Sequence, residues 1–84
     1  MAILFARSAA KHRINAIRVQ YVLEHHVWTF DVDNGVTLLL GPDRQGVDLE
    51  VGTRKRGDDV LVIHAIKVRP QFLDEYRRHL PWPR

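Results

Sequence analysis

Three polar side chains that could carry out chemistry stand towards the end of an otherwise apolar run. They are His64, Lys67 and Arg69, in the segment "DDVLVIHAIKVRPQF" at residues 58–72. An imidazole can take or give a proton near neutral pH, and lysine and arginine side chains can bind a phosphate group. Two explanations stay open. One is a catalytic site, and the other is a core histidine bonded to a carbonyl or helix group, with two cations that mark where a strand meets water.

Two further basic clusters could contact an anionic ligand. Such clusters can hold a phosphate backbone without reading a base sequence, and His12 could act as a general acid or base. The simpler explanation is that both clusters are solvated surface loops. The clusters are Lys11, His12 and Arg13 near the start of the chain, and Arg54, Lys55 and Arg56 in an expected hairpin.

The composition limits the classes of protein that this chain can represent. Its 84 residues predict one domain, residues 1–84, with a single modest core. The net charge is +3 and arginine outnumbers lysine ten to three, which is compatible with binding to nucleic acid. There is no cysteine, so disulfides and thiolate zinc sites are excluded. The five histidines have no metal-ligand spacing, and we predict neither a metal nor a cofactor.

The first ten residues, "MAILFARSAA", contain an apolar run of only five residues before Arg7. Such a run is too short for a signal peptide and far too short to cross a bilayer. We therefore expect a cytoplasmic protein that makes no contact with membranes.

Two helices are expected before the first strand. Residues 4–11 could form a short first helix. The segment "INAIRVQYVLEHH" at residues 14–26 predicts a second helix, with Asn15 as its N-cap and Ile14 packed onto Val19. Apolar residues recur along it at 3.6-residue spacing, so one face of this helix should be buried.

From residue 27 the apolar pattern changes to every second residue, which is typical of strands. Turn signals in "DNG", "PDRQG" and "RKRGDD" separate four such runs, which predicts an antiparallel meander. The last run, Val60 to Val68, is apolar on both faces and should be central. The runs are "VWTFDVD", "VTLLLG", "VDLEV" and "VLVIHAIKV".

A final helix is expected from Pro70 until Pro81 stops it. Tyr76 belongs to its apolar stripe, and Trp82 stands between two prolines just after it. The predicted fold is therefore α+β: two N-terminal helices, a four-stranded antiparallel meander and a C-terminal helix. Tyr76 and Trp82 are candidate anchors for a partner protein.

Several short motifs are similar, in order and spacing, to those of BrnT-type toxins. "KHRIN" at residues 11–15 resembles the start of that family's amphipathic helix, and Arg56-Gly57-Asp58 resembles its hairpin. Val62-Ile63-His64-Ala65 resembles the strand in which the family has Ile-Ile-Ser-Ala followed by Arg. Leu40-Gly41 and Gly46 match its glycine turns, and the resemblance covers residues 9–76.

The resemblance implies a RelE-like fold and an endoribonuclease toxin of a type II toxin–antitoxin pair, held inactive by a protein antitoxin. There are departures. His64 stands where the family has serine, and Ile66 stands where it has arginine. Lys67 comes one residue later, on the opposite strand face. Pro42 and Asp43 replace the basic residue of the first glycine turn.

Cleavage of RNA without a metal needs one group to take the proton of the 2′-hydroxyl, another to protonate the leaving oxygen, and cations to hold the phosphate. We expect His64, Lys67 and Arg69 to form this site, with His12 or Arg54 assisting. The expected partners are RNA and an antitoxin, with DNA contacted only through the antitoxin complex; the chain could also form a homodimer. The alternative is a non-catalytic module of the same fold that binds a partner protein.

Overall fold

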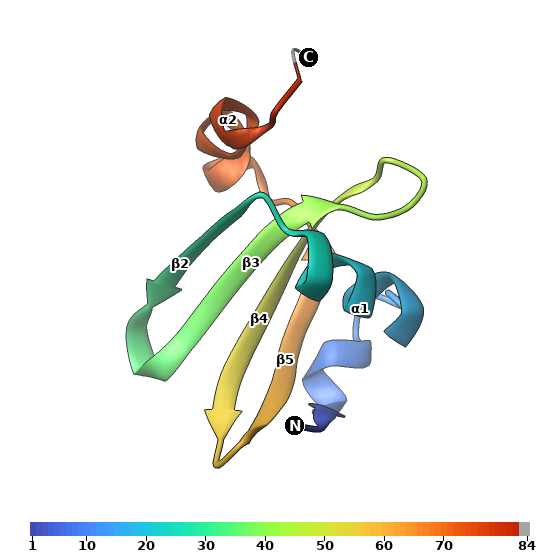
Figure 1. Cartoon of the computed structure of the whole chain (residues 1–84), viewed down its shortest axis with the longest axis vertical. Helices are drawn as coiled ribbons and strands as arrows, with labels where there is room; N and C mark the ends of the chain where they lie inside the picture. Colours follow the sequence, from blue (N-terminus) through green and yellow to red (C-terminus); the bar gives the residue numbers. More distant parts are fainter. Residues whose placement is uncertain (83–84) are drawn as a thin grey trace.

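A mixed five-stranded sheet with one helix on each face makes up the protein (Figure 1). The computed structural model describes residues 1–82. The strand order is β1-β5-β4-β3-β2, so β5 lies between β1 and β4. The strands are β1 (Ile3–Phe5), β2 (Trp28–Val32), β3 (Val36–Pro42), β4 (Asp48–Arg56) and β5 (Asp59–Lys67), and the helices are α1 (Ala16–His25) and α2 (Pro70–His79).

Strands β2 to β5 pair antiparallel with one another in sequence order, and residues in left-handed conformations make the turns between them. Asn34 and Gly35, with φ of 63° and 73°, connect β2 to β3. Gly46 has a φ of 81° in the β3–β4 turn, and Gly57 has a φ of 62° in the β4–β5 turn. Asparagine and glycine adopt this region at low cost, which is why these short turns can form.

The N-terminal segment corrects the predicted fold, because the expected helix over residues 4–11 does not exist. Ile3–Phe5 instead forms β1, which pairs in parallel with residues 60–62 of β5 and turns the meander into a mixed sheet. The backbone amide of Ala6 donates to the carbonyl of Val62, and only one 3-10 turn, Arg7–Ala10, follows. An isolated helix of two turns is only marginally stable in water. Residues Ile3–Phe5 instead gain backbone hydrogen bonds by pairing with the otherwise unpaired edge of β5.

Helix α1 covers one face of the sheet and builds the first core cluster (Figure 1). As predicted, the Asn15 side chain caps it by accepting from the amide of Arg18. The helix buries Val19 and Val22 completely or nearly so. They pack with Ala9, Leu49, Val51, Val62 and Ala65.

Helix α2 packs on the opposite face, at the end of the sheet where β5 stops (Figure 1). Arg69 is its N-cap position and Pro70 opens the helix, as expected for a residue that lacks an amide hydrogen. The ring of Trp28 stacks on His79 with 4.9 Å between centroids. The buried residues of this second cluster are Leu38, Leu40, Tyr76 and Leu80.

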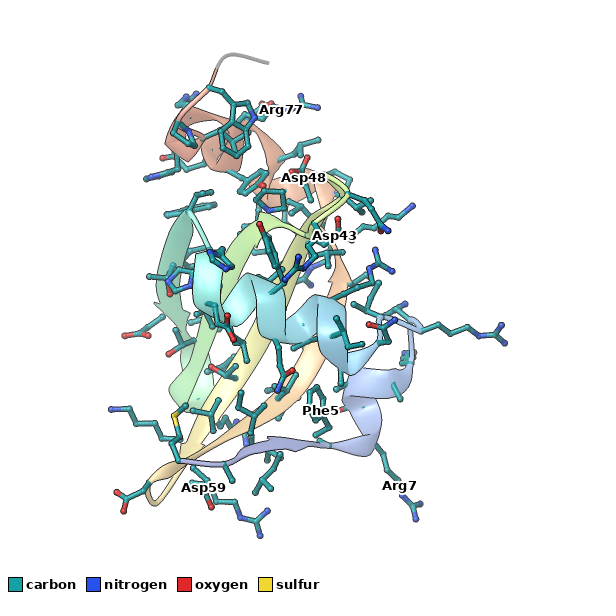
Figure 2. All side chains as sticks on the ribbon, turned by 45° about the vertical axis from the view of Figure 1, so that its right-hand side comes forward. Phe5, Arg7, Asp43, Asp48, Asp59 and Arg77 are labelled. Carbon is teal, nitrogen blue, oxygen red and sulfur yellow. The ribbon has the colours of Figure 1, made fainter. Side chains whose placement is uncertain are left out.

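A hollow of about 850 Å³ lies on the α1 side of the sheet, towards the hairpin ends of the strands. Figure 2 shows Asp59 near this end of the molecule and Asp43 and Asp48 near the other. Glu24 and Lys55 are among the residues that line the hollow. Its apolar lining consists of Met1, Ile3, Leu23, Leu39 and Val60.

No helix among residues 1–82 is long and apolar enough to cross a membrane.

Two leucine-to-alanine substitutions should lower the stability of the protein by very different amounts. Leu49 is 0% exposed in the α1 cluster, whereas Leu4 on the edge strand is 36% exposed. Leu49→Ala should lower the free energy of unfolding by about 2–5 kcal/mol. Leu4→Ala, the matched control, should change it by much less, about 1 kcal/mol or below. Urea denaturation measures both, and equal losses would contradict the described packing.

Candidate active site

A buried glutamate joins two of the predicted site residues on the α2 side of the sheet. Glu50 of β4 is 0% exposed. Its Oε2 lies 3.0 Å from His64 Nε2 and accepts a hydrogen bond from Arg69 Nε at 2.9 Å, and Arg69 Nη2 lies 2.7 Å away. Its Oε1 accepts from the backbone amide of Arg69 at 2.8 Å. We call Glu50, His64 and Arg69 the Glu50 cluster.

Sheet register brings His64 to Glu50. His64 stands opposite Gly52, two residues along β4 from Glu50, so the two side chains are diagonal neighbours on one face. A side chain at residue 52 would crowd His64. A Cβ there would lie 3.1 Å from His64 Cβ and 3.3 Å from Leu38 Cδ2. Gly52 therefore leaves the space in which His64 lies over β4.

The connection from β5 to α2 brings in Arg69. Its backbone is extended, with φ −73° and ψ 150°, and this turns the chain towards Glu50 before Pro70 starts the helix. The guanidinium carbon lies 5.2 Å from the ring centroid of Phe72. Backbone amide, carboxylate and aromatic ring together fix the orientation of the arginine.

The cluster keeps Glu50 ionised. Burial alone raises the pKa of Glu50, but the hydrogen bonds from His64 and Arg69, with the charge of Arg69, outweigh it and hold this pKa below its ordinary value. A buried carboxylate with charged and polar donors on both oxygens is stable in the charged form. The carboxylate can therefore orient its neighbours, and it has no surface on which to receive a substrate proton.

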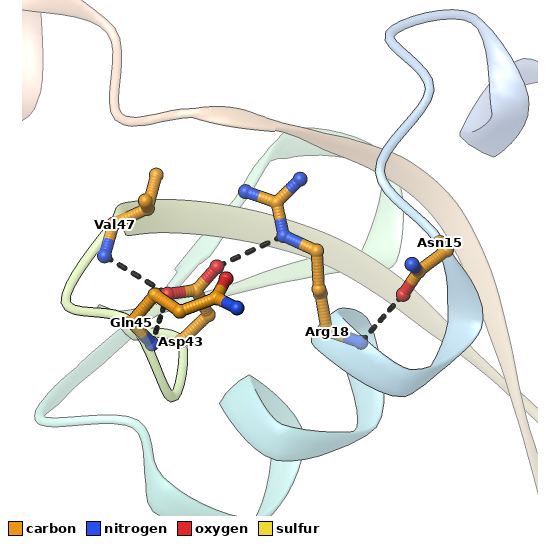
Figure 3. A network of polar contacts seen from close by, with 5 residues as sticks. All are labelled: Asn15, Arg18, Asp43, Gln45 and Val47. Carbon is orange, nitrogen blue, oxygen red and sulfur yellow. Dashed lines mark hydrogen bonds and ion pairs between the residues drawn. The ribbon is translucent and has the colours of Figure 1, made fainter.

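A second buried carboxylate shapes the β3–β4 turn (Figure 3). Asp43 Oδ1 accepts from the amides of Gln45 and Val47, both at 2.9 Å, and Oδ2 accepts from Arg18 Nε of α1 at 2.9 Å. Burial raises the pKa of Asp43, but these backbone hydrogen bonds and Arg18 lower it overall. Asp43 thus folds the turn and ties it to α1.

Lys67, the third residue of the predicted catalytic group, lies apart from the Glu50 cluster. It pairs with Leu49, whose side chain is in the α1 core, so Lys67 belongs to the opposite face from His64. In an uninterrupted strand, alternation would place Lys67 and Arg69 on the same face. They lie on different faces because β5 ends at Lys67 and the chain bends back to Glu50 before Arg69.

The other predicted basic residues are on the surface. Lys11, His12 and Arg13 are exposed in the loop before α1, where Arg13 has a φ of 59°. Arg54, Lys55 and Arg56 are exposed at the hairpin end of β4, the strand that carries Glu50. Among residues 1–82, no hydrogen bond or ion pair joins any of these six side chains to the Glu50 cluster.

The two candidate partner anchors have different surroundings. Tyr76 is 0% exposed, and its hydroxyl donates to Asp48 Oδ1 at 2.7 Å, which ties α2 to the start of β4. Its burial gives it a packing role and makes it unsuitable as a surface anchor. Trp82 is 43% exposed.

Sequence reasoning missed Glu50 and Gly52. "VDLEV" places Glu50 on the polar side of an alternating strand, which predicts a solvated residue. The signal that could have found Glu50 is the apolar character of both faces of the neighbouring run, Val60 to Val68, which implies that the second face of the sheet is covered as well. Within the described part of the chain, no group of three histidine or acidic side chains could hold a metal ion.

Both buried carboxylates predict loss of stability in acid. Their pKa values in the folded protein lie below the ordinary 3.8 of Asp43 and 4.5 of Glu50, so the stability that they contribute is complete above about pH 4.5. It is lost as the pH falls through the folded-state values. Denaturation at a series of pH values should give an unfolding free energy that decreases below about pH 4.5. Asp43→Asn should weaken this dependence, and an identical slope in that variant would contradict the role of Asp43.

Gly52→Val should displace His64. The valine Cβ alone would lie 3.1 Å from His64 Cβ and 3.3 Å from Leu38 Cδ2, and overpacking of this kind typically costs about 1–3 kcal/mol. Lys55→Val, at an exposed position of the same strand, is the control and should be nearly neutral. Denaturation gives the stability, and the NMR shifts of the His64 ring report its position. Unchanged ring shifts in Gly52→Val would contradict the described contact.

Comparisons with known proteins identify one similar structure. No family model matches the sequence, and no curated protein matches it. The fold is similar to the 1.1 Å crystal structure of the Brucella abortus ribonuclease toxin BrnT. The TM-score is 0.64, the sequence identity is 16%, and the match covers 82% of this chain and 97% of that chain. The resemblance to BrnT-type toxins is therefore confirmed at the level of the fold.

Proposed function

We propose that this protein is the toxin of a type II toxin–antitoxin pair and cleaves RNA without a metal ion. The observation that carries the proposal is the Glu50 cluster, in which a carboxylate-bound histidine and an arginine share one face of the sheet. The fold of a ribonuclease toxin supports it further. An intracellular RNA would be the substrate and the cytoplasm the place of action.

His64 and Arg69 have the chemistry that RNA cleavage needs. The His64 side chain is 28% exposed and can exchange a proton with a bound 2′-hydroxyl. The Arg69 side chain is 37% exposed, and Glu50 engages its Nε and Nη2 edge. Nη1, which Glu50 does not engage, would donate to a phosphate oxygen as negative charge develops there.

The remaining basic side chains would hold the RNA outside the cluster. Lys11, Arg13 and the hairpin residues Arg54, Lys55 and Arg56 would contact phosphates along a single strand, and His12 and Lys67 would assist. A net charge of +3 favours such contacts. Binding should weaken with salt, because each phosphate contact releases a counterion.

The partner would be an antitoxin protein, and any contact with DNA would pass through the antitoxin complex. A second candidate function is a non-catalytic module of the same fold that only binds this partner. One observation favours it. Both carboxylate oxygens of Glu50 are bound by His64 and Arg69 of the same chain. An ion cluster that only joins α2 to the sheet would have the same contacts.

A cleavage assay with paired histidine variants tests the proposed function. His64→Gln can still donate to Glu50 but cannot take a proton at neutral pH, so it should lower the rate of RNA cleavage by about 10²–10⁴-fold. His25→Gln, at an exposed position in α1, should leave the rate unchanged. Induced expression of the wild type should arrest bacterial growth and produce new RNA ends, and His64→Gln should not.

Folded wild-type protein that leaves RNA intact at every concentration would overturn the ribonuclease proposal. Tight binding to a neighbouring gene product under the same conditions would then favour the module. Circular dichroism of each variant shows whether the fold is retained, so a loss of cleavage is not confused with unfolding.

A further inference from the structure

The two ring nitrogens of His64 have different surroundings. Nε2 lies 3.0 Å from Glu50 Oε2. Among residues 1–82, no side chain or backbone group hydrogen-bonds to Nδ1. In a neutral imidazole one nitrogen carries the hydrogen and the other has a free lone pair, and the hydrogen bond made by one nitrogen decides which.

Glu50 can only accept at this position. Its carboxylate is ionised, and Oε2 already faces the guanidinium of Arg69, so it offers no hydrogen to the ring. The nitrogen that meets it must carry the hydrogen.

We propose that Glu50 is a positioning residue that fixes His64 as the tautomer with hydrogen on Nε2, which makes Nδ1 the atom that takes the proton of the attacking hydroxyl. This inference rests on the proposed function. Glu50 itself is excluded as the base, because it is fully buried and both of its oxygens are engaged.

Nδ1 takes the proton of the 2′-hydroxyl, the 2′-oxygen forms a bond to phosphorus, and the bond from phosphorus to the 5′-oxygen breaks. The leaving oxygen takes a proton from solvent water, and the hydroxide that remains takes the proton from Nδ1. The products are a 2′,3′-cyclic phosphate and a 5′-hydroxyl. The positive ring formed during the step is stabilised by the charge of Glu50.

Glu50 positions both His64 and Arg69. The same Oε2 atom that meets His64 Nε2 also meets Arg69 Nε and Nη2, so one carboxylate sets the positions of the base and of the phosphate-binding cation. Proton-transfer groups act efficiently only when held within hydrogen-bonding reach of the reacting atom. Loss of Glu50 should therefore disturb the His64 tautomer even where the chain still folds.

The experiment is an NMR measurement on the intact ¹⁵N-labelled protein near neutral pH. Protonated and unprotonated ring nitrogens have well-separated ¹⁵N shifts, so two-bond correlations of His64 identify the tautomer directly. We expect Nε2 to be protonated and Nδ1 to be bare in the wild type. His25, which has no buried carboxylate beside it, provides the internal reference. A wild-type ring with its hydrogen on Nδ1 would overturn the inference.

Glu50→Gln supplies the second arm. Its amide can donate as well as accept, so the tautomer preference of His64 should be lost and RNA cleavage should fall more than about tenfold, as when an orienting carboxylate is removed beside a histidine base. Glu50→Asp, which keeps the charge, should retain the wild-type tautomer. A Glu50→Gln protein with unchanged tautomer and cleavage would also overturn the inference.

The two proposals fail in different ways. Wild-type protein that never cleaves RNA but holds hydrogen on Nε2 contradicts the ribonuclease function and leaves the tautomer assignment correct. Cleaving wild-type protein with hydrogen on Nδ1 contradicts the tautomer assignment and leaves the function correct. If Glu50→Gln does not fold, Glu50→Asp and the wild-type spectrum still decide the question.

Discussion

The carboxylate of Glu50 must be neutralised inside the protein, because no part of this residue reaches water. An unpaired buried charge costs several kcal/mol even after the surroundings relax, on the order of half the stability of a small domain. Its partners come from one strand and from the connection that follows it, namely His64 and Arg69. The position of His64 over Gly52 and the entry of the chain into α2 both depend on this requirement. A single electrostatic constraint thus sets the geometry of the candidate site.

The two faces of the sheet differ in how far a helix covers them. On the α1 side, Asp43 ties the β3–β4 turn to Arg18 and fixes the helix over the first core cluster. On the α2 side, the helix covers only one end of the sheet, so His64 and Arg69 are close to a packed core and still partly exposed. A rigid sheet with a half-open face is suited to holding proton-transfer groups, because their positions are fixed by packing while a ligand can still reach them.

Periodicity, capping and turn signals predicted the residues of α1, of four strands and of α2, because each of these depends on neighbours in the sequence. β1 was not predictable in this way. Its three residues form a strand only because β5 offers an unpaired edge almost sixty residues later. The Glu50 cluster was likewise only partly predictable. His64 and Arg69 were recognised by their residue types in an apolar run, whereas Glu50 has the sequence pattern of a solvated residue in an alternating strand. Its burial is decided by the helix that packs over it, which no local pattern reports.

The most direct test of the account is to find where a non-cleavable RNA binds. A short single-stranded oligonucleotide with 2′-O-methyl groups cannot supply the attacking hydroxyl, so it can be titrated into the ¹⁵N-labelled protein and followed by NMR. If the Glu50 cluster binds RNA, the resonances of Gly52, His64 and Arg69 should shift most, with smaller changes along the β4–β5 hairpin. Shifts confined to the hollow on the α1 side, or no saturable binding at low salt, would contradict the claim that the Glu50 cluster is an RNA site.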